Sequence, residues 1–318
     1  MTPERKKALE EVRRFLGRHT PYDLLPPSSR VPVLDTRLVV RKALAALLQH
    51  GLASAPLYDA EKKQYAGTLT MTILVHLIHH YHAHPTTTKD YGEVIQEVDR
   101  LQIQELQEKV QGTWNGASNH LVSIRPCDSL VDAAKTMLER KARRLPLVDV
   151  DGSGDDVIVG VLTQHRLLRF LAVNFPDIDA FQENAQVKEL GIGQYEDVAT
   201  ATLETPVAQV IRKFVERRVT AVPIIDDQGV VLNVYEKADV LTLMYEGKPG
   251  DLELPVCDAL LRRSLDFEGV HTCRCDTTLG DLLLALQQYR IHRFIVVDED
   301  NRLCGVITLS DMIRYLLS

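Results

Sequence analysis

The hydrophobic positions of the chain recur in a fixed order: a helical segment, a short apolar run that ends in aspartate, a polar turn, a second apolar run and another helical segment. The first runs are APLYD, LPLVD, VPIID and RFIVVD, which end at Asp59, Asp149, Asp226 and Asp298. An apolar residue lies 19 positions before each aspartate and opens the first helical segment: Val40, Leu130, Val207 and Leu279. A period kept through four copies predicts a repeat architecture.

The pattern inside each repeat indicates how the repeats pack. In LGDLLLALQQYRI, four leucines fall on one helix face: Leu279, Leu282, Leu283 and Leu286. The strands are apolar on both faces, which is typical of strands covered by helices. Because one repeat leaves a face uncovered, we expect an α/β (α+β) fold in which the four repeats are paired into two modules.

The repeats and the segments between them define the expected domains. Repeat 1 spans 35–84, repeat 2 spans 121–175, repeat 3 spans 195–246 and repeat 4 spans 265–318. Residues 1–34 form an N-terminal extension that we expect to bind a partner. Residues 85–120 form a linker region, whose stretch YGEVIQEVDRLQIQELQEKV predicts a polar amphipathic helix on the surface.

The junction between the second strand and the second helix carries candidate ligand residues. In repeat 4, GVITLSD places Asp311 13 residues after Asp298, and in repeat 3, EKAD places Asp239 13 residues after Asp226. Ile73 and Arg166 stand there in repeats 1 and 2. Asp239, or Ser310 with Asp311, could serve simply as a helix cap. A carboxylate can also accept two hydrogen bonds from a ribose cis-diol, and this role would explain why only two repeats keep it.

Basic pairs recur just before the central strands. In repeats 2 and 4, ARRLP holds Arg143 and Arg144 and RIHRF holds His292 and Arg293, each immediately before the central strand. Repeat 3 adds ERRVT, with Arg217 and Arg218, and LLRRS adds Arg262 and Arg263 outside that position. A planar guanidinium suits phosphate because it donates two parallel hydrogen bonds. These pairs, together with the carboxylates, predict a phosphorylated ribose ligand. The alternative is that each pair is solvated surface charge.

Composition narrows the class of protein. The 318 residues carry a formal net charge of -7, which disfavours nonspecific nucleic-acid binding. We expect no membrane span and no secretory signal, because no long apolar run is present. Five scattered cysteines favour a reducing compartment, so we expect a cytoplasmic and nuclear location. Cys273 and Cys275 have no second close pair, and no metal site is expected from them.

The repeated unit resembles the CBS repeat, which pairs into Bateman modules. From YDLLPPSSRVPVLDT to RIHRFIVVDEDNRLCGVITLSD, the chain resembles the γ regulatory subunits of the AMP-activated protein kinase, called the sucrose-non-fermenting kinase complex in fungi. The DFEGV run at 266–270 and the four-repeat layout make the resemblance specific. It implies two Bateman modules forming a flat disc, with adenine-nucleotide pockets around a central channel and no catalytic cofactor.

The resemblance also assigns site residues. In the repeat-4 pocket, Asp311 with Ser310 and Thr308 would hold a ribose, and the adenine and backbone contacts would come from Ala199, Val219 and Thr220. In the repeat-3 pocket, Asp239 would hold the ribose, with Arg263 and His292 towards phosphate. Basic channel positions fall on Arg144, Arg293 and, at a histidine position of the family, Arg143. The chain departs from the family pattern at four further positions: Ala53, Ile73, His165 and Gln194.

Three functions follow as hypotheses. The first is a non-catalytic energy sensor that binds AMP, ADP or ATP and joins a catalytic α and a scaffolding β subunit, with RVPVLDT (30–36) as an edge for a partner strand. The second is a nucleotide-independent scaffold of the same kinase. The third is a metal-dependent enzyme that uses the cluster His76, His79, His80, His82 and His84. Because no known catalytic motif occurs, we predict that the chain is not an enzyme.

Overall fold

Two compact units make up the chain, and each combines alternate repeats. The computed structural model describes residues 3–26, 31–83, 100–113, 121–175, 186–246, 251–263 and 267–318. Unit 1 contains Met1–Val31, Val122–Val198 and Val270–Ser318, and therefore repeats 2 and 4. Unit 2 contains Pro32–Leu121 and Ala199–Gly269, and therefore repeats 1 and 3. Each unit has its own hydrophobic core.

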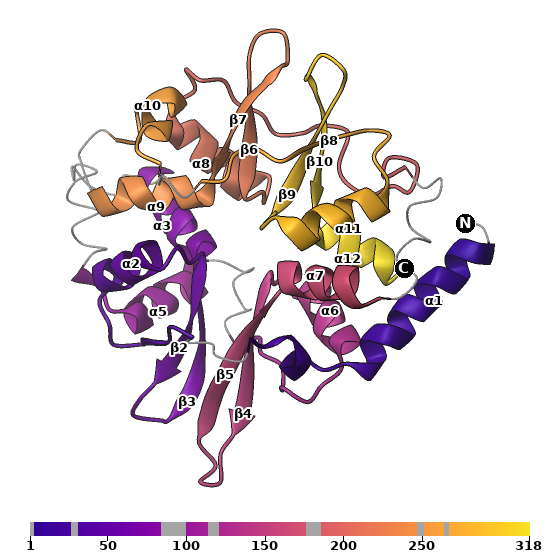
Figure 1. The fold of residues 1–318 in the computed structure, drawn as a ribbon. Coiled ribbons are helices and arrows are strands. Elements are labelled where there is room, and N and C mark those ends of the chain that lie inside the picture. Colours follow the sequence, from indigo (N-terminus) through magenta and orange to yellow (C-terminus); the bar gives the residue numbers. More distant parts are fainter. Residues whose placement is uncertain are drawn as a thin grey trace. The chain divides into compact units, whose positions relative to one another are not determined.

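The elements of unit 2 follow the predicted order in both of its repeats (Figure 1). Repeat 1 consists of β1 (Leu34–Asp35), α2 (Val40–Gln49), β2 (Ser54–Asp59), β3 (Gln64–Thr70) and α3 (Met71–Ala83), followed by α5 (Ile103–Thr113). Repeat 3 consists of α8 (Val207–Glu216), β6 (Ala221–Ile225), β7 (Val231–Glu236) and α9 (Lys237–Glu246), followed by α10 (Val256–Leu260).

Unit 1 repeats this order and adds the N-terminal segment. It opens with α1 (Pro3–Arg18) and the 3-10 helix η1 (Pro21–Leu24). Repeat 2 consists of α6 (Leu130–Glu139), β4 (Arg144–Val150), β5 (Asp156–Thr163) and α7 (Gln164–Asn174). Repeat 4 consists of β8 (Thr272–Arg274), α11 (Leu279–Gln288), β9 (Arg293–Val297), β10 (Leu303–Thr308) and α12 (Leu309–Leu316).

Each repeat is built around an antiparallel hairpin, and two of them have a third strand that the sequence pattern did not reveal. β1 pairs in parallel with β2, and β8 pairs in parallel with β9. In repeats 2 and 3 a single parallel bridge takes this place, between Ile124 and Leu147 and between Ala201 and Ile224. Strands of two or three residues are too short to show a period of two, which is why the sequence does not predict them.

The predicted helix starts are confirmed in all four repeats. The first helices begin at Val40, Leu130, Val207 and Leu279, and each of these residues is fully buried. The leucine face of α11 is buried as its spacing predicts. The recurring aspartate closes the hairpin turn: Asp226 Oδ1 accepts hydrogen bonds from the backbone N–H groups of Gln228 and Val230 at 2.9 and 2.8 Å. Asp298 does the same for Asp300 and Arg302.

The described part of the linker contains the helix α5, which buries one of its faces. α5 begins at Ile103, and residues 85–99 and 114–120 of the expected linker lie outside the described residues. Ile103 and Leu106 are fully buried in the core of unit 2, whereas Gln104, Glu105 and Glu108 are exposed, so the described helix is amphipathic as expected. The backbone explains this burial, because Ile103 N–H donates to Leu38 O at 3.0 Å and Gln104 N–H donates to Thr36 O at 2.9 Å.

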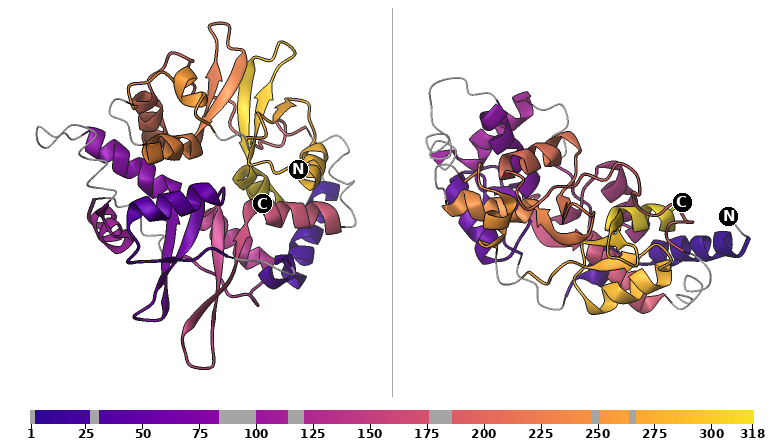
Figure 2. Two further views of the ribbon diagram at one scale, coloured as in Figure 1. Left: turned by 60° about the vertical axis from the view of Figure 1, so that its left-hand side comes forward. Right: turned by 90° about the horizontal axis from the view of Figure 1, so that it is seen from above.

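The helix α1 is part of unit 1. Figure 2 shows it beside α6 and the end of α12. Leu9, Val12 and Leu16 turn its apolar face into the core, and the Arg13 guanidinium donates to Leu317 O at 2.9 Å. Among the described residues of this segment, the outer face of α1, Tyr22 and Val33 are exposed, and partner binding by residues 1–34 stays a prediction. Within the described residues, no helix is both long and apolar enough to span a membrane.

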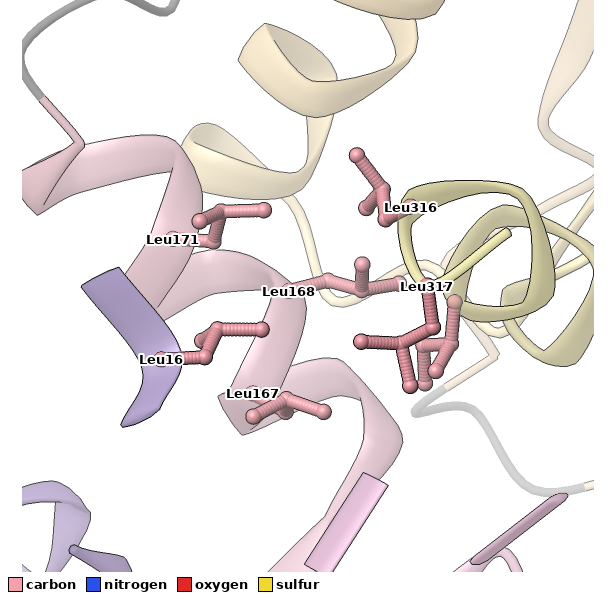
Figure 3. Close-up of a pocket in the computed structure, with 7 residues that line it drawn as sticks. Leu16, Leu167, Leu168, Leu171, Leu316 and Leu317 are labelled. Carbon is pink, nitrogen blue, oxygen red and sulfur yellow. The ribbon is translucent and has the colours of Figure 1, made fainter. Parts of the chain in front are cut away.

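An apolar recess lies where α1, α7 and α12 meet. Figure 3 shows its lining, which consists of Leu16, Leu167, Leu168, Leu171, Ile313, Leu316 and Leu317. No side chain of this lining can pair with phosphate or with a ribose hydroxyl. The recess is therefore a gap in the core of unit 1 and does not suit a charged ligand.

Candidate anion-binding site

The N-terminal ends of two helices meet inside each unit. In unit 1, Gln164 is the first residue of α7, and its amide donates to Ser310 Oγ at 2.9 Å while Ser310 donates back to Gln164 Oε1 at 3.2 Å. In unit 2, Lys237 is the first residue of α9 and donates to Thr72 Oγ1, on α3, at 3.3 Å. Two helix N-termini at one place add their partial positive charges, which favours an anion beside them.

Asp311 is the third residue of α12 and forms a capping box. Its Oδ2 accepts hydrogen bonds from Thr308 N–H at 3.0 Å and Thr308 Oγ1 at 2.6 Å, and Thr308 Oγ1 accepts from Asp311 N–H at 3.3 Å. The N-cap is therefore Thr308, and neither Ser310 nor Asp311 takes that position. Asp311 therefore takes part in the helix cap as the third residue of α12. Its hydrogen bonds to Thr308 orient its carboxylate.

The second oxygen of Asp311 is held loosely. Asp311 Oδ1 accepts from Arg314 at 2.7 Å, but the Arg314 side chain is 66% exposed. An ion pair this exposed contributes little stability, because solvent screens it. An incoming hydroxyl group can therefore replace Arg314 at small cost.

The predicted arginines gather beside Asp311. Arg143 and Arg144 lie at the start of β4, and Arg293 begins β9. Burial lowers the pKa of Arg143 and Arg144 to about 10 and that of Arg293 to about 9. Asp311 opposes this shift at Arg143, whereas Arg290 adds repulsion at Arg144. All these values stay above neutral pH, so the group carries several mutually repelling positive charges.

Two histidines complete the basic cluster. The rings of His165 and His292 lie 6.5 Å apart in an edge-on arrangement. His165 Nε2 lies 3.1 Å from Tyr289 O, so Nε2 carries the proton in the neutral ring. Burial, reinforced by Arg144 and Arg290, lowers the pKa of His292 to about 4, and burial also lowers the pKa of His165. His292 is therefore neutral at pH 7.

Solvent reaches this cluster even though protein surrounds it. Arg143, Arg290 and His292 are exposed side chains, and Arg144 and Arg293 are half-buried. A dissolved anion can therefore contact these donors. An anion would relieve the repulsion among them, and this geometry suits phosphate.

Arg166 lies close enough to the basic cluster to lower the pKa of Arg144 and of His165. Its backbone N–H is capped by Thr163 Oγ1 at 3.1 Å, and its guanidinium donates to Val161 O at 3.1 Å. The side chain thus folds back onto β5. The expectation that Arg166 leaves the repeat-2 junction unused, as the family resemblance implies, stays a prediction.

Unit 1 brings together most of the predicted residues, and unit 2 holds the rest. Unit 1 contains Arg143, Arg144, His292, Arg293, Thr308, Ser310 and Asp311. Unit 2 contains Ala199, Val219, Thr220, Asp239 and Arg263. Ala199 and Val219 pack against the core of unit 2, and Thr220 O accepts from Lys237 N–H at 3.1 Å. Their grouping with Asp311 in one pocket stays a prediction.

Asp239 and Arg263 do meet, but as partners of each other. Arg263 Nε donates to Asp239 Oδ1 at 2.7 Å, and Nη2 donates to Oδ2 at 2.6 Å. Burial raises the pKa of Asp239, and the Arg263 hydrogen bonds oppose that shift. The Arg263 guanidinium is bound to the Asp239 carboxylate in this structure, and its expected role towards a phosphate stays a prediction.

Two residues of the cluster were missed from the sequence. Arg290 is the first residue of RIHRF, eight positions before Asp298, but it lies outside the basic pair of that motif, whose positions match Arg143 and Arg144 of repeat 2. Gln164 shows no signal of its own, because a glutamine at a helix start is common and its contact with Ser310 joins positions far apart in the chain.

The histidine cluster gains no support as a metal site. His76 and His79 are half-buried on α3, and His84 lies outside the described residues. Burial lowers the pKa of His76 to about 4, with Lys237 as the next cause. In the part of the chain that the structure describes, no group of three His, Cys, Asp or Glu residues could hold a metal ion.

The comparisons with known proteins define the class first. The CBS domain model matches residues 117–173, 188–246 and 265–318, so the chain is a CBS-repeat protein. Residues 35–84 lie outside these matches, although α2, β2, β3 and α3 follow the same order. The fold is similar to a crystal structure of a Methanocaldococcus jannaschii protein that is described as an archaeal homologue of the γ subunit. The TM-score is 0.67 and the sequence identity is 16%, and the alignment covers 93% of this chain and 99% of the archaeal chain. At this identity, the likeness shows the fold alone.

The sequence relatives define the family. The chain is 40% identical over 315 residues to the 5′-AMP-activated protein kinase subunit gamma of Saccharomyces cerevisiae, which covers 99% of this chain and 95% of the yeast protein. It is also 40% identical over 316 residues to the same subunit of Kluyveromyces lactis, and the alignment covers 99% of this chain and 93% of the Kluyveromyces protein. The chain therefore belongs to the family of AMP-activated protein kinase γ subunits. These are non-catalytic regulatory subunits, which confirms the predicted resemblance and the prediction that the chain is not an enzyme.

Proposed function

We propose that the chain binds adenine nucleotides as the regulatory subunit of a heterotrimeric Ser/Thr protein kinase and senses AMP and ADP against ATP. The observation that carries this proposal is the convergence of basic side chains from repeats 2 and 4 beside Asp311 in unit 1. Cations and helix N-termini suit the phosphates, and the carboxylate suits a ribose diol. Membership of the family supports a catalytic α and a scaffolding β subunit as partners. The location in the cytoplasm and the nucleus stays a prediction from the five scattered cysteines.

The proposed mechanism is differential binding. AMP, ADP and ATP differ in phosphate charge and length, and the cluster offers both fixed arginine charges and histidines that can take up protons. A ligand shifts the state of the kinase only by the difference in its affinity for the two states. A nucleotide-independent scaffold is the alternative, and the isoleucine at position 73 favours it at repeat 1 because it cannot accept a ribose hydroxyl.

Replacing Asp311 with alanine is expected to weaken AMP binding about tenfold to a hundredfold. A hydrogen bond to a charged acceptor contributes about 1.5–3 kcal/mol, and about 1.4 kcal/mol corresponds to a factor of ten. Isothermal titration calorimetry of the full chain measures the change.

Asp281→Ala is the matched control for this variant. Asp281 is the third residue of α11 and forms the same capping box with Thr278 in the same repeat. Both variants lose a cap, which costs about 1 kcal/mol of stability. Equal AMP affinity in the two variants would refute the ribose role of Asp311.

Lowering the pH from about 7.5 to about 5.5 is expected to tighten the binding of sulfate, which keeps its charge over this range. His292 has a pKa of about 4 in the empty site, below its ordinary 6.5. A bound anion offsets the neighbouring cations and raises this pKa, so binding takes up a proton and strengthens as the pH falls. The empty chain behaves in the opposite way: the depressed pKa makes it lose stability as the pH falls from 6.5 towards 4.

Two variants test this dependence. His292→Gln is expected to flatten the pH profile of sulfate affinity, whereas His271→Gln, at a half-buried histidine of the same unit, is expected to keep it. A profile that is equally steep in His292→Gln would show that the proton is taken up elsewhere.

A further inference from the structure

Three of the five cysteines gather at one end of the repeat-4 sheet. Cys273 lies on β8, Cys275 directly follows β8, and Cys304 lies on β10. β8 and β10 flank β9 on its two sides. All three side chains are half-buried and pack against the core of unit 1, so they share one face of this sheet. The proposed nucleotide site makes no use of these thiols.

The strand register brings two of the thiols to the same end of β9. β8 runs parallel to β9, with Arg274 opposite Val297, the last residue of β9. Cys275 therefore lies just past that end. β10 runs antiparallel to β9, with Leu303 also opposite Val297, so Cys304 is one residue in from the same level.

Both backbone segments depart from regular strand geometry at these cysteines. The register of β10 shifts between Leu303 and Gly305, which makes Cys304 the extra residue of a β-bulge. A bulge bends its strand and re-aims a side chain. On the other side of β9, the chain turns directly after β8, where Thr277 N–H donates to Arg274 O at 3.2 Å. These two features allow the side chains to approach each other across the end of β9.

Cys275 and Cys304 contact each other. Their side chains share a hydrogen bond. Burial raises the pKa of Cys304, and Cys275 raises it further, whereas the nearby Lys188 opposes this shift. A disulfide bond is about 2 Å long, so two sulfurs in hydrogen-bond contact need only a small approach to form one.

Tyr195 covers this end of the sheet. A Cβ atom at Gly305 would lie 2.7 Å from Tyr195 Cδ1, so the ring packs directly on the backbone next to Cys304. Lys188 Nζ lies 5.7 Å from the centre of the same ring. Burial raises the pKa of Tyr195 to about 12, and two of the three cysteines contribute to this shift. The half-buried sulfurs are thus open to a small oxidant and shielded from a large one.

We propose that Cys275 and Cys304 are a redox site, in which hydrogen peroxide converts the two thiols into a disulfide that joins the bulge of β10 to the segment after β8. The Cys304 sulfur attacks the peroxide, the O–O bond breaks, and a sulfenic acid and one water form. The Cys275 sulfur then attacks the Cys304 sulfur, and the hydroxyl group leaves as a second water. The two thiols lose two electrons and two protons, and the peroxide is reduced to two waters. Cys304 attacks first because the positive charge of Lys188 favours its thiolate.

The proposed disulfide goes beyond the nucleotide function and does not rest on it. In the reducing compartment that the sequence predicts, the pair stays as thiols until an oxidant rises, which is typical of redox-sensing cysteines. The bond would close a loop of about 30 residues and so restrict the unfolded chain. The oxidised chain is therefore expected to melt at a higher temperature than the reduced chain.

Peptide mapping of the full chain after treatment with hydrogen peroxide tests the proposal. Trypsin cleaves after arginine, so the three cysteines of the cluster fall on three separate peptides: 264–274, 275–290 and 303–314. The oxidised chain is expected to lose two of its five thiols. Peptides 275–290 and 303–314 are expected to be linked to each other, and dithiothreitol is expected to separate them.

Three variants assign the link to its residues. Cys275→Ser and Cys304→Ser are each expected to abolish the link and the rise in melting temperature on oxidation. Cys273→Ser is the matched control, since Cys273 lies on the same face of the same sheet, and it is expected to keep both.

Several results would overturn the proposal, and the wild-type map gives them even if a variant does not fold. A link from peptide 264–274 in place of the expected one would assign the redox site to Cys273. Five remaining thiols, thiol loss without a link, or a link only between two chains would show that the pair does not close. An equal yield of the expected link in the denatured chain would show that the fold does not bring the two thiols together.

Discussion

The double variant Arg144→Gln with Arg293→Gln is expected to bind AMP about a hundredfold to ten-thousandfold more weakly than the wild type. Each arginine is expected to donate at least one charged hydrogen bond to phosphate, at about 1.5–3 kcal/mol each, and about 1.4 kcal/mol corresponds to a factor of ten. Glutamine keeps a polar side chain of similar length, so the change removes mainly charge. Isothermal titration calorimetry of the full chain measures the loss.

The same double variant is expected to be more stable than the wild type when no ligand is present. Burial lowers the pKa of both Arg144 and Arg293, and neighbouring arginines add repulsion at each. Removing two of these charges therefore relieves a cost that the empty site bears. A higher melting temperature with a lower AMP affinity separates loss of the site from loss of the fold, in line with the common trade-off between stability and function.

The control for this double variant is Arg125→Gln with Arg302→Gln. Both arginines are exposed in unit 1, and Arg302 pairs with Asp300, which is 69% exposed. The control changes the net charge equally, so it measures any long-range effect of charge on a phosphorylated ligand. If it weakens AMP binding as much as the double variant does, the cluster has no specific role.

Arg263→Gln is expected to lower the free energy of unfolding by about 3–5 kcal/mol, the usual cost of leaving a buried charge without its partner. The variant strips Asp239 of two hydrogen bonds and leaves Asn233 Oδ1 and Val234 O without this donor. Urea denaturation followed by circular dichroism measures the change. Arg212→Gln should change it by less than about 1 kcal/mol, because its pair with Glu216 is exposed.

A double-mutant cycle tests the assignment of this cost to the ion pair. Arg263→Gln combined with Asp239→Asn removes the charge that the single variant leaves uncompensated. The double variant is therefore expected to lose less stability than the sum of the two single variants, as for residues in direct contact. Strict additivity would show that Arg263 stabilises unit 2 through its other contacts.

The repeat period predicted the secondary structure well because local signals determine it. The residues 19 positions before the turn aspartates begin the first helices, and those aspartates accept turn hydrogen bonds in repeats 1, 3 and 4. In repeat 2 the hairpin is longer, and Asp151 accepts the hydrogen bonds from Ser153 and Asp155 instead. These contacts span a few residues, which is the range that a sequence pattern reports.

The positive charge of the candidate site could also be predicted, from the residues at fixed positions before the turn aspartates. The residues five and six positions before the turn aspartate are basic in repeats 2 and 4: Arg144 with Arg143, and Arg293 with His292. The equivalent residues in repeats 1 and 3 are small and uncharged: Ser54 with Ala53, and Ala221 with Thr220. Because unit 1 combines repeats 2 and 4, it collects the basic positions.

Long-range contacts could not be predicted in the same way. The repeat pattern does not say which repeats pack together, because all four first helices present similar apolar faces. The pairing of Arg263 with Asp239 depends on the fold of residues 251–263, and the burial of Ile103 depends on backbone hydrogen bonds to Thr36 and Leu38. Both features need contacts between segments that the sequence alone does not align.

Titration of the wild-type chain with AMP tests the central claim most directly, with adenosine and inorganic phosphate as partial ligands. The account predicts saturable AMP binding that is tighter than binding of either fragment, because the basic cluster and Asp311 act on different parts of one molecule. Binding that is lost in the Arg144→Gln, Arg293→Gln variant places the phosphate at the cluster. An AMP titration with no saturable heat, or one that this variant leaves unchanged, would contradict the account.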